Sequence, residues 1–122
     1  MTEKVDLEGL PDRVAEYGPA AYLVTIGEDG PHVVSVVVTL DDGTLTMGAG
    51  RTSRRNVAER PVATLLWPAG PDGAYSLLVD GEAAARSAES PLTVRPKSAI
   101  LHRVAGTDAD AGPTCLPVTP TA

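Results

Sequence analysis

The segment at residues 32–40, with the sequence HVVSVVVTL, constrains the fold of this 122-residue chain more than any other part of it. Five of its nine residues are valine, a β-branched residue that favours strands. Side chains alternate between the faces of a strand, so Val34 and Val36 share one face while Val33 and Val37 share the other. Both faces are therefore apolar and need cover from water. Because the chain has too little helix to cover an outer sheet face, the segment predicts a homodimer that packs sheet on sheet.

Hydrophobic segments separated by turn signals predict five further strands. Residues 20–27 are apolar and rich in β formers, and a Glu-Asp-Gly turn follows them. The Asp42-Gly43 pair is a strong hairpin signal, so residues 20–50 are expected to form an antiparallel meander. The other expected strands are residues 44–49, 62–67, 75–85 and 92–104. Pro96 lies inside the last of them, which predicts a sheet edge or a β-bulge there.

Two short helices complete the expected elements. The first, at residues 7–18, has side chains at helical spacing on one face: Leu7, Leu10, Val14 and Tyr17. The second, at residues 53–60, is about two turns long and is ended by Pro61. These elements predict a mainly β fold, a six-stranded antiparallel split β-barrel with two short helices, for a domain at residues 1–105. Residues 106–122 form a Pro-rich C-terminal tail, which is either disordered or an arm that lies on a partner.

Composition argues against several classes of function. The net charge of −6 and the pI near 4.7 argue against nucleic-acid binding, where basic faces dominate affinity. No run of about 18 apolar residues exists, so we expect no membrane span, and the first residues lack the order of a signal peptide, which predicts the cytoplasm. The single Cys115 has no cysteine partner for a disulfide or a structural zinc site. Asp80 and Glu82 are expected to be a solvated strand end, so no metal site is predicted.

One local feature runs against the acidic average. Four of the ten basic residues fall within ten positions: Arg51, Arg54, Arg55 and Arg60. They follow a turn of small residues, Gly48-Ala49-Gly50, at the expected start of a helix that Thr52 or Ser53 can cap. A helix N-terminus carries partial positive charge, so arginines there make sense if an anion such as phosphate binds. The alternative is a set of solvated arginines, with Arg55 paired to Glu59 one turn later.

Two stretches of the sequence resemble a known family. Residues 30–36, GPHVVSV, and residues 45–67, LTMGAGRTSRRNVAERPVATLLW, are similar to the pyridoxamine 5′-phosphate oxidase-like, FMN-binding split β-barrel proteins. The resemblance covers about residues 7–104, and it is most specific over residues 44–67. There a strand, a small-residue turn and a basic Ser/Thr loop precede Asn, Pro and a strand that ends in Trp. The resemblance implies an FMN cofactor and a homodimer with both cofactors at its interface.

The resemblance also implies which residues form the site. The FMN phosphate is expected on Arg51, Thr52, Ser53 and Asn56, and the flavin ring against Val34, Ser35, Val36, Met47, Gly48 and Ala49. Many members carry a Ser-x-Lys pattern in this loop, whereas this chain has Arg51 at the Ser position and Ser53 at the Lys position. The sequence names no catalytic residue. His32, Trp67 and the pair His102-Arg103 could each reach a ligand, and each also fits a purely structural role.

The implied function is that of an FMN-binding oxidoreductase acting on a small molecule. True pyridoxamine 5′-phosphate oxidases are longer and carry a basic C-terminal segment that binds substrate, whereas this chain has an acidic, Pro-rich tail. Pyridoxamine phosphate is therefore not the expected substrate. One alternative is a reductase of the same fold that uses the deazaflavin F420, whose phosphate could occupy the same loop. The other is a barrel dimer without flavin that serves as a binding module.

Overall fold

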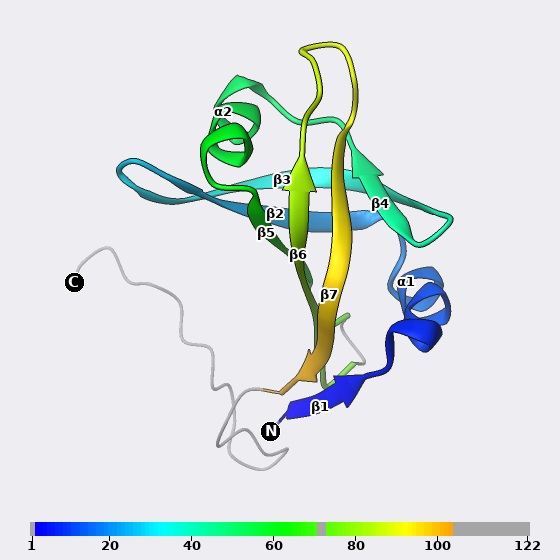
Figure 1. Cartoon of the computed structure of the whole chain (residues 1–122). Helices are drawn as coiled ribbons and strands as arrows, with labels where there is room; N and C mark the ends of the chain where they lie inside the picture. The colour runs from blue at the N-terminus through cyan, green and yellow to red at the C-terminus, as the bar shows by residue number, and fades with distance from the viewer. Residues whose placement is uncertain (1, 71–72, 104–122) are drawn as a thin grey trace, which may run out of the picture.

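The computed structural model describes residues 2–70 and 73–103, and within them six strands form a closed ring (Figure 1). The strands are β2 (Ala20–Gly27), β3 (Gly30–Asp41), β4 (Thr44–Met47), β5 (Val62–Trp67), β6 (Ser76–Ala84) and β7 (Leu92–His102). Their order is β7-β4-β3-β2-β5-β6, and β6 pairs back onto β7. All of these pairings are antiparallel. The predicted six-stranded split barrel with two short helices is therefore confirmed.

A seventh strand, β1 (Thr2–Val5), is absent from the sequence-based prediction. It pairs with β7, from Thr2 opposite His102 to Val5 opposite Ala99. Three of its four side chains are exposed and only Val5 is buried, so the segment lacks the apolar alternation that marks a strand. Pairing with the free side of β7, rather than local propensity, makes this segment a strand.

Pro96 lies inside β7, where the sequence predicts an edge or a bulge, and the structure has a bulge. Asp80 of β6 pairs with Ser98 of β7, and the next residue, Gly81, pairs with Pro96. Lys97 is therefore the extra residue of the bulge. The other side of β7 pairs with β4 over residues 92–94 and with β1 over residues 99–102. Pro96 falls between these two pairings, so its missing N–H interrupts neither ladder.

The alternation of β3 divides its side chains between the barrel core and an outer face. Val36 and Val38 are buried in the core together with Leu23 of β2. On the outer face, Val33 is 57% exposed and Val37 is 70% exposed. The strand is thus apolar on both faces, as predicted, and within the described part of the chain the outer side chains stay exposed.

Helix α1 (Leu10–Tyr17) follows a 3₁₀ turn at Leu7–Gly9 and packs Leu10 and Val14 into the core. Leu7 is 41% exposed, so the expectation that it shares the packed helical face is wrong. Leu7 lies in the 3₁₀ turn before the helix, where 3.0 rather than 3.6 residues per turn replace the helical spacing on which the expectation depends. No helix in the described part of the chain has the length and apolar character needed to cross a membrane.

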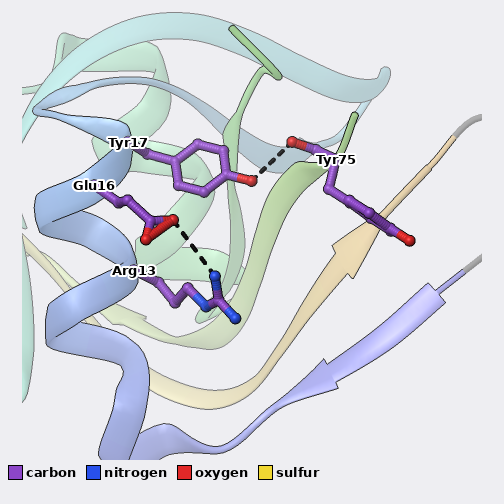
Figure 2. A network of polar contacts seen from close by, with 4 residues as sticks. All are labelled: Arg13, Glu16, Tyr17 and Tyr75. Atoms are coloured by element: carbon purple, nitrogen blue, oxygen red, sulfur yellow. Dashed lines mark hydrogen bonds and ion pairs between the residues drawn. The ribbon is translucent and has the colours of Figure 1, made fainter. Parts of the chain in front are cut away.

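A hydrogen bond from Tyr17 ties the end of α1 to the barrel (Figure 2). The Tyr17 hydroxyl donates to the backbone carbonyl of Tyr75 at 2.8 Å. Beside it, Arg13 and Glu16 form an exposed ion pair at 3.4 Å. Burial, and secondarily the Glu16 carboxylate, raise the pKa of Tyr17 above its ordinary value, against a smaller opposing effect of Arg13. The neutral, hydrogen-bonding form of Tyr17 is therefore the one the fold favours.

Replacing Tyr17 with Phe removes this hydrogen bond and leaves the Tyr75 carbonyl without its donor. We expect the free energy of unfolding at pH 7 to fall by about 1 kcal/mol, measured by denaturant titration. Because the pKa of Tyr17 is raised in the folded state, wild-type stability from this group is lost as the pH rises above about 10. The gap between wild type and Tyr17→Phe should therefore narrow above that pH. A gap that stays constant would contradict the assigned role of the hydroxyl.

Candidate functional site

The basic cluster of arginines lies on helix α2 (Arg51–Glu59) and at its end, and this helix follows β4 through a short turn. The helix begins two residues earlier than predicted, and its N-cap is Gly50, with no side-chain hydrogen bond to the first turn. The expectation that Thr52 or Ser53 caps the helix is therefore wrong, because both lie inside that turn. The first intrahelical bond runs from Arg54 N–H to the Gly50 carbonyl at 3.1 Å, so the three preceding N–H groups have no acceptor within the helix. With no acidic residue in the first turn, its partial positive charge is uncompensated.

Ser53 is buried in this first turn, with 1% of its surface exposed. Its Oγ is enclosed and has no hydrogen-bond partner. A buried hydroxyl left unpaired costs about 1–3 kcal/mol, so an unpaired group of this kind calls for an explanation such as an absent ligand. Ser53 is also one of the residues that line a cleft.

The cleft has a volume of about 440 Å³ and lies between β3 and the N-terminus of α2. It is lined by eight of the ten predicted site residues: Val34, Ser35, Val36, Gly48, Ala49, Arg51, Thr52 and Ser53. His32 and Gly50, which the predicted set omits, line it as well. His32 shares a face of β3 with Val34 and Val36, so the alternation of side chains along the strand identifies it. Gly50 lies between two predicted residues, Ala49 and Arg51, in the sequence. None of these lining residues carries a carboxylate.

Met47 and Asn56, the other two predicted site residues, direct their side chains elsewhere. Met47 is 3% exposed and belongs to the barrel core. Asn56 is 4% exposed, and its Nδ2 donates to Thr25 Oγ1 on β2 at 3.1 Å. A Cβ at Gly27 would lie 3.0 Å from Asn56 Oδ1, so the glycine makes room for the amide. Asn56 thus anchors α2 to the barrel and acts on the cleft through the position of the helix.

The four arginines of the basic cluster have different roles. Arg54 donates from Nε to the Ala49 carbonyl at 2.9 Å, from Nη1 to the Ser87 carbonyl at 2.8 Å and from Nη2 to the Ser90 carbonyl. It is therefore a structural cation that ties the loop between β6 and β7 to the end of β4, and the expectation that it is free to meet an anion is wrong. Sequence proximity alone could not reveal this, because two of the three acceptor carbonyls lie more than thirty residues away.

Arg51 and Arg55 are exposed, one helical turn apart. The alternative in which Arg55 pairs with Glu59 is wrong, because Glu59 forms an ion pair with Arg60 at 3.5 Å. Of the basic cluster, Arg51 is the arginine that lines the cleft beside Ser53. Of the four arginines predicted as a cluster, Arg51 is therefore the one placed to meet a ligand in this cleft.

A cleft of about 560 Å³ over β6 and β7 has a different character. Its carboxylate, Glu82, is exposed and pairs with Lys97 at 2.7 Å and with Arg95 at 3.2 Å. The hydrogen bond from Lys97 holds the pKa of Glu82 below its ordinary value. Asp80 accepts a short hydrogen bond from Thr64, so both carboxylates of this strand have protein partners. The described residues contain no group of three or more His, Cys, Asp and Glu that could hold a metal ion.

Three other residues considered from the sequence have structural roles or lie outside the described chain. Trp67 is 1% exposed, and its Nε1 donates to the Gly18 carbonyl at 2.8 Å, so it belongs to the core. His102 Nδ1 lies 3.5 Å from Thr2 Oγ1, at the pairing of β7 with β1. Cys115 and the tail at residues 106–122 lie outside the described residues.

Comparison of sequences identifies close relatives. The chain is 39% identical over 133 aligned positions to the uncharacterized protein Mb0449c of Mycobacterium bovis and, equally, to the uncharacterized protein MT0457 of Mycobacterium tuberculosis. Each alignment covers 93% of this chain and 92% of the relative. No known family profile matches the chain.

Several solved structures share the architecture of this chain. A candidate pyridoxamine 5′-phosphate oxidase from Listeria innocua superposes with a TM-score of 0.65 at 16% identity and covers 79% of this chain and 98% of its own. A FAD-binding protein from Mesorhizobium loti gives a TM-score of 0.61 at 11% identity, over 83% and 96% of the two chains. An F420 reductase gives 0.56 at 18% identity, over 68% and 90%. At these identities the similarity establishes the fold, which confirms the resemblance noted in the sequence.

Ser53 and Asn56 allow a matched test, because both are buried polar residues of α2 and only Asn56 has a partner. In the ligand-free protein, Ser53→Ala removes an unpaired hydroxyl and adds a better helix former, so the free energy of unfolding should rise by about 0.5–1 kcal/mol. Asn56→Ala should lower it by about 1–3 kcal/mol, because a buried hydrogen bond is lost. Denaturant titration measures both. A loss of stability in Ser53→Ala would show that the hydroxyl has a partner in the free protein.

Proposed function

We propose that this chain, which belongs to the same family as the mycobacterial proteins Mb0449c and MT0457 and has the pyridoxamine 5′-phosphate oxidase-like split-barrel fold, is an FMN-binding flavoprotein. Its proposed activity is that of an oxidoreductase, which exchanges a hydride between the flavin and a small molecule. Because the sequence after Gly106 contains Asp108 and Asp110 but no Lys or Arg, that molecule is proposed to be other than pyridoxamine 5′-phosphate.

The observation that carries the proposal is the buried, unpaired Oγ of Ser53 in the first turn of an uncapped helix. A phosphate group offers several strong acceptor oxygens and carries negative charge. The same turn offers the free N–H groups of Arg51, Thr52 and Ser53, the Ser53 hydroxyl and the Arg51 guanidinium. Donors of this kind at a helix N-terminus are the usual protein partners of phosphate. The residues present therefore fit the phosphate end of FMN.

The remainder of the cleft suits a flat, mostly apolar ring. Val34 and Val36 on β3 and Ala49 after β4 supply apolar lining. Around Gly48 there is open space where a Cβ would stand, so a ring can approach the backbone there. Ser35 and His32 add polar groups at the edge of this lining.

A bound flavin supplies two-electron chemistry, while the protein supplies binding, orientation and electrostatics. In this chain the first turn of α2 would hold the phosphate, and β3 with the small-residue turn would line the ring. Asn56 and Arg54 hold α2 and the turn in register with the barrel. His32 is the one histidine among the described residues that line the cleft, and its ring nitrogens can donate or accept a hydrogen bond with a bound ring.

A reductase that uses F420 is the second candidate, because an F420 reductase shares this fold and the same helix turn can receive its phosphate. The visible spectrum of the purified protein, with and without added FMN, separates the candidates when it is combined with a titration of F420. A protein that takes up added FMN supports the first proposal. Uptake of F420 alone supports the second. A protein that binds neither compound would be a barrel that serves as a binding module, and both proposals would fail.

Arg51→Ala removes the one guanidinium that lines the cleft beside Ser53. We expect the Kd for FMN to rise about tenfold or more, because a charge-assisted hydrogen bond contributes about 1.5–3 kcal/mol. Quenching of flavin fluorescence during titration measures the affinity. Arg60→Ala, at the opposite end of α2, is the control and should keep the wild-type Kd. An unchanged Kd in Arg51→Ala would refute the placement of the phosphate.

The apolar outer face of β2, β3 and β5 supports a homodimer as part of this proposal. It consists of outward-facing side chains that are 37–70% exposed: Tyr22, Ile26, Val33, Val37 and Val62. Because β2 pairs with both β3 and β5, these side chains form one continuous surface. Soluble monomers seldom expose a large contiguous apolar patch. Ser35 lies between Val33 and Val37 on β3 and also lines the cleft, so a second copy on this face would border the cofactor.

Val37→Lys places a charge at the most exposed side chain of this face and should shift the protein from dimer to monomer. Sedimentation velocity at micromolar concentration measures the change. Thr2→Lys introduces the same charge at an exposed strand position on β1, outside the apolar face, and should leave the assembly unchanged. A monomeric wild-type protein, or a dimer that survives Val37→Lys, would overturn the homodimer proposal.

A further inference from the structure

We propose that the loop at residues 85–91, between β6 and β7, controls how tightly the cofactor cleft holds a phosphate, and that Arg54 is the positioning residue through which the loop acts. None of the described residues that line the cofactor cleft belongs to this loop. The inference rests on the proposed function, and it adds a regulatory connection between a loop outside the cleft and the phosphate end of FMN.

Arg54 is half-buried and joins the loop to the turn before α2. Its Nε donates to the Ala49 carbonyl at 2.9 Å, while Nη1 and Nη2 donate to the carbonyls of Ser87 and Ser90. Figure 1 shows the loop rising next to the helix. Because a guanidinium is a rigid planar group, the loop carbonyls that hold the two Nη atoms also fix the direction of Nε. The position of the loop therefore determines where Arg54 holds the Ala49 carbonyl.

The loop is closed by hydrogen bonds of its own. The Ser90 N–H donates to the Ser87 carbonyl at 3.3 Å and to the Ser87 hydroxyl oxygen at 3.2 Å. The two serine hydroxyls lie 2.8 Å apart, so one donates to the other. These bonds set the spacing of the two carbonyls that Arg54 uses, and a change in them would move both Nη partners.

Arg54 holds both carbonyls of the turn before α2, since its side chain donates to Ala49 and its backbone N–H donates to Gly50 at 3.1 Å. In a planar trans peptide, the N–H of the following residue points opposite to the carbonyl. The N–H groups of Gly50 and Arg51 therefore point away from these two bonds. Both residues line the cofactor cleft, where free N–H groups at a helix start are donors for phosphate. Arg54 itself does not line this cleft, so it acts by orienting donors rather than by binding the ligand.

The test compares the Kd values of FMN and of riboflavin, the same flavin without the phosphate, in three variants. Arg54→Lys keeps the positive charge but lacks the planar fork that joins the loop to the turn. A double variant, Ser87→Ala with Ser90→Ala, leaves Arg54 in place and removes the hydroxyl hydrogen bond that closes the loop. Arg86→Gln is the matched control, because Arg86 is an exposed residue of the same loop that does not line the cofactor cleft.

We expect the Kd of FMN to rise about fivefold in Arg54→Lys and about threefold in the double variant, because hydrogen bonds to a charged group weaken when their donors are misaligned. The Kd of riboflavin should keep its wild-type value in both, and Arg86→Gln should change neither Kd. A variant that only loosens the fold would raise both Kd values alike. The ratio of the two Kd values therefore separates positioning of the phosphate donors from a general structural role.

Hydrogen exchange gives the reciprocal measurement. If the loop controls phosphate binding, bound FMN must in turn protect the amides of residues 85–91, because the coupling between two sites is reciprocal. We expect this protection in wild type and its loss in Arg54→Lys, and riboflavin should not produce it.

Parallel losses for FMN and riboflavin in Arg54→Lys, or a double variant with the wild-type ratio of the two Kd values, would overturn the inference while the proposed function stands. A loop that exchanges equally fast with and without FMN would do the same. A wild-type protein that binds no FMN would refute the proposed function and this inference with it.

Discussion

The pairing of β6 with β7 closes the sheet into a ring, and the candidate site depends on that closure. Nine residues of β6 pair with β7, and the register shifts once, at Gly81. The two strands pass so closely there that a Cβ at Gly81 would overlap the Arg95 carbonyl, so only glycine fits. Beyond this bulge the two strands continue to the loop that Arg54 fastens beside α2. Without ring closure that loop would have no fixed position relative to the helix.

Helix α2 depends on tertiary contacts in turn. At nine residues it is too short to be stable alone, and its sequence provides no N-terminal side-chain cap. The buried hydrogen bond from Asn56 to Thr25 and the side chain of Val57 in the core attach it to the barrel instead. The N–H groups of the first turn therefore have no partner within the helix, while the second turn is attached to the barrel. The proposed anion site is positioned in this way by residues that lie outside it.

The parts of the fold that depend on local pattern could be predicted from the sequence. The alternating valines of β3 and the Asp42-Gly43 turn define the meander, and Pro96 marks the bulge. The strand β1 could not be predicted, because its existence depends on the free side of β7 rather than on its own residues. The sequence pattern also predicts the start of α2 two residues too late, because the N-cap is Gly50, which forms no side-chain hydrogen bond that a sequence could signal.

The candidate site shows the same division. Eight of the ten residues that the sequence assigns to the site line one cleft, because they are neighbours along two short segments. The sequence treats Arg51, Arg54 and Arg55 alike, although Arg51 lines the cleft, Arg54 binds backbone carbonyls and Arg55 is exposed outside the cleft. Only contacts between distant segments separate these roles. The unpaired state of Ser53 is likewise invisible in a sequence, since it depends on what the folded chain fails to bring near the hydroxyl.

The first turn of α2 combines three features that each oppose folding of the ligand-free protein. These are the absence of a side-chain cap, the unpaired Ser53 hydroxyl and the like charges of Arg51 and Arg55 at adjacent turns. An acidic chain could neutralise such a site with carboxylates, yet Glu59 pairs with Arg60 at the far end of the helix. An anion bound at this turn would relieve all three features at once. A ligand that binds only the folded state stabilises it roughly in proportion to the logarithm of the ligand concentration. The free energy of unfolding of this chain would then rise as the cleft fills.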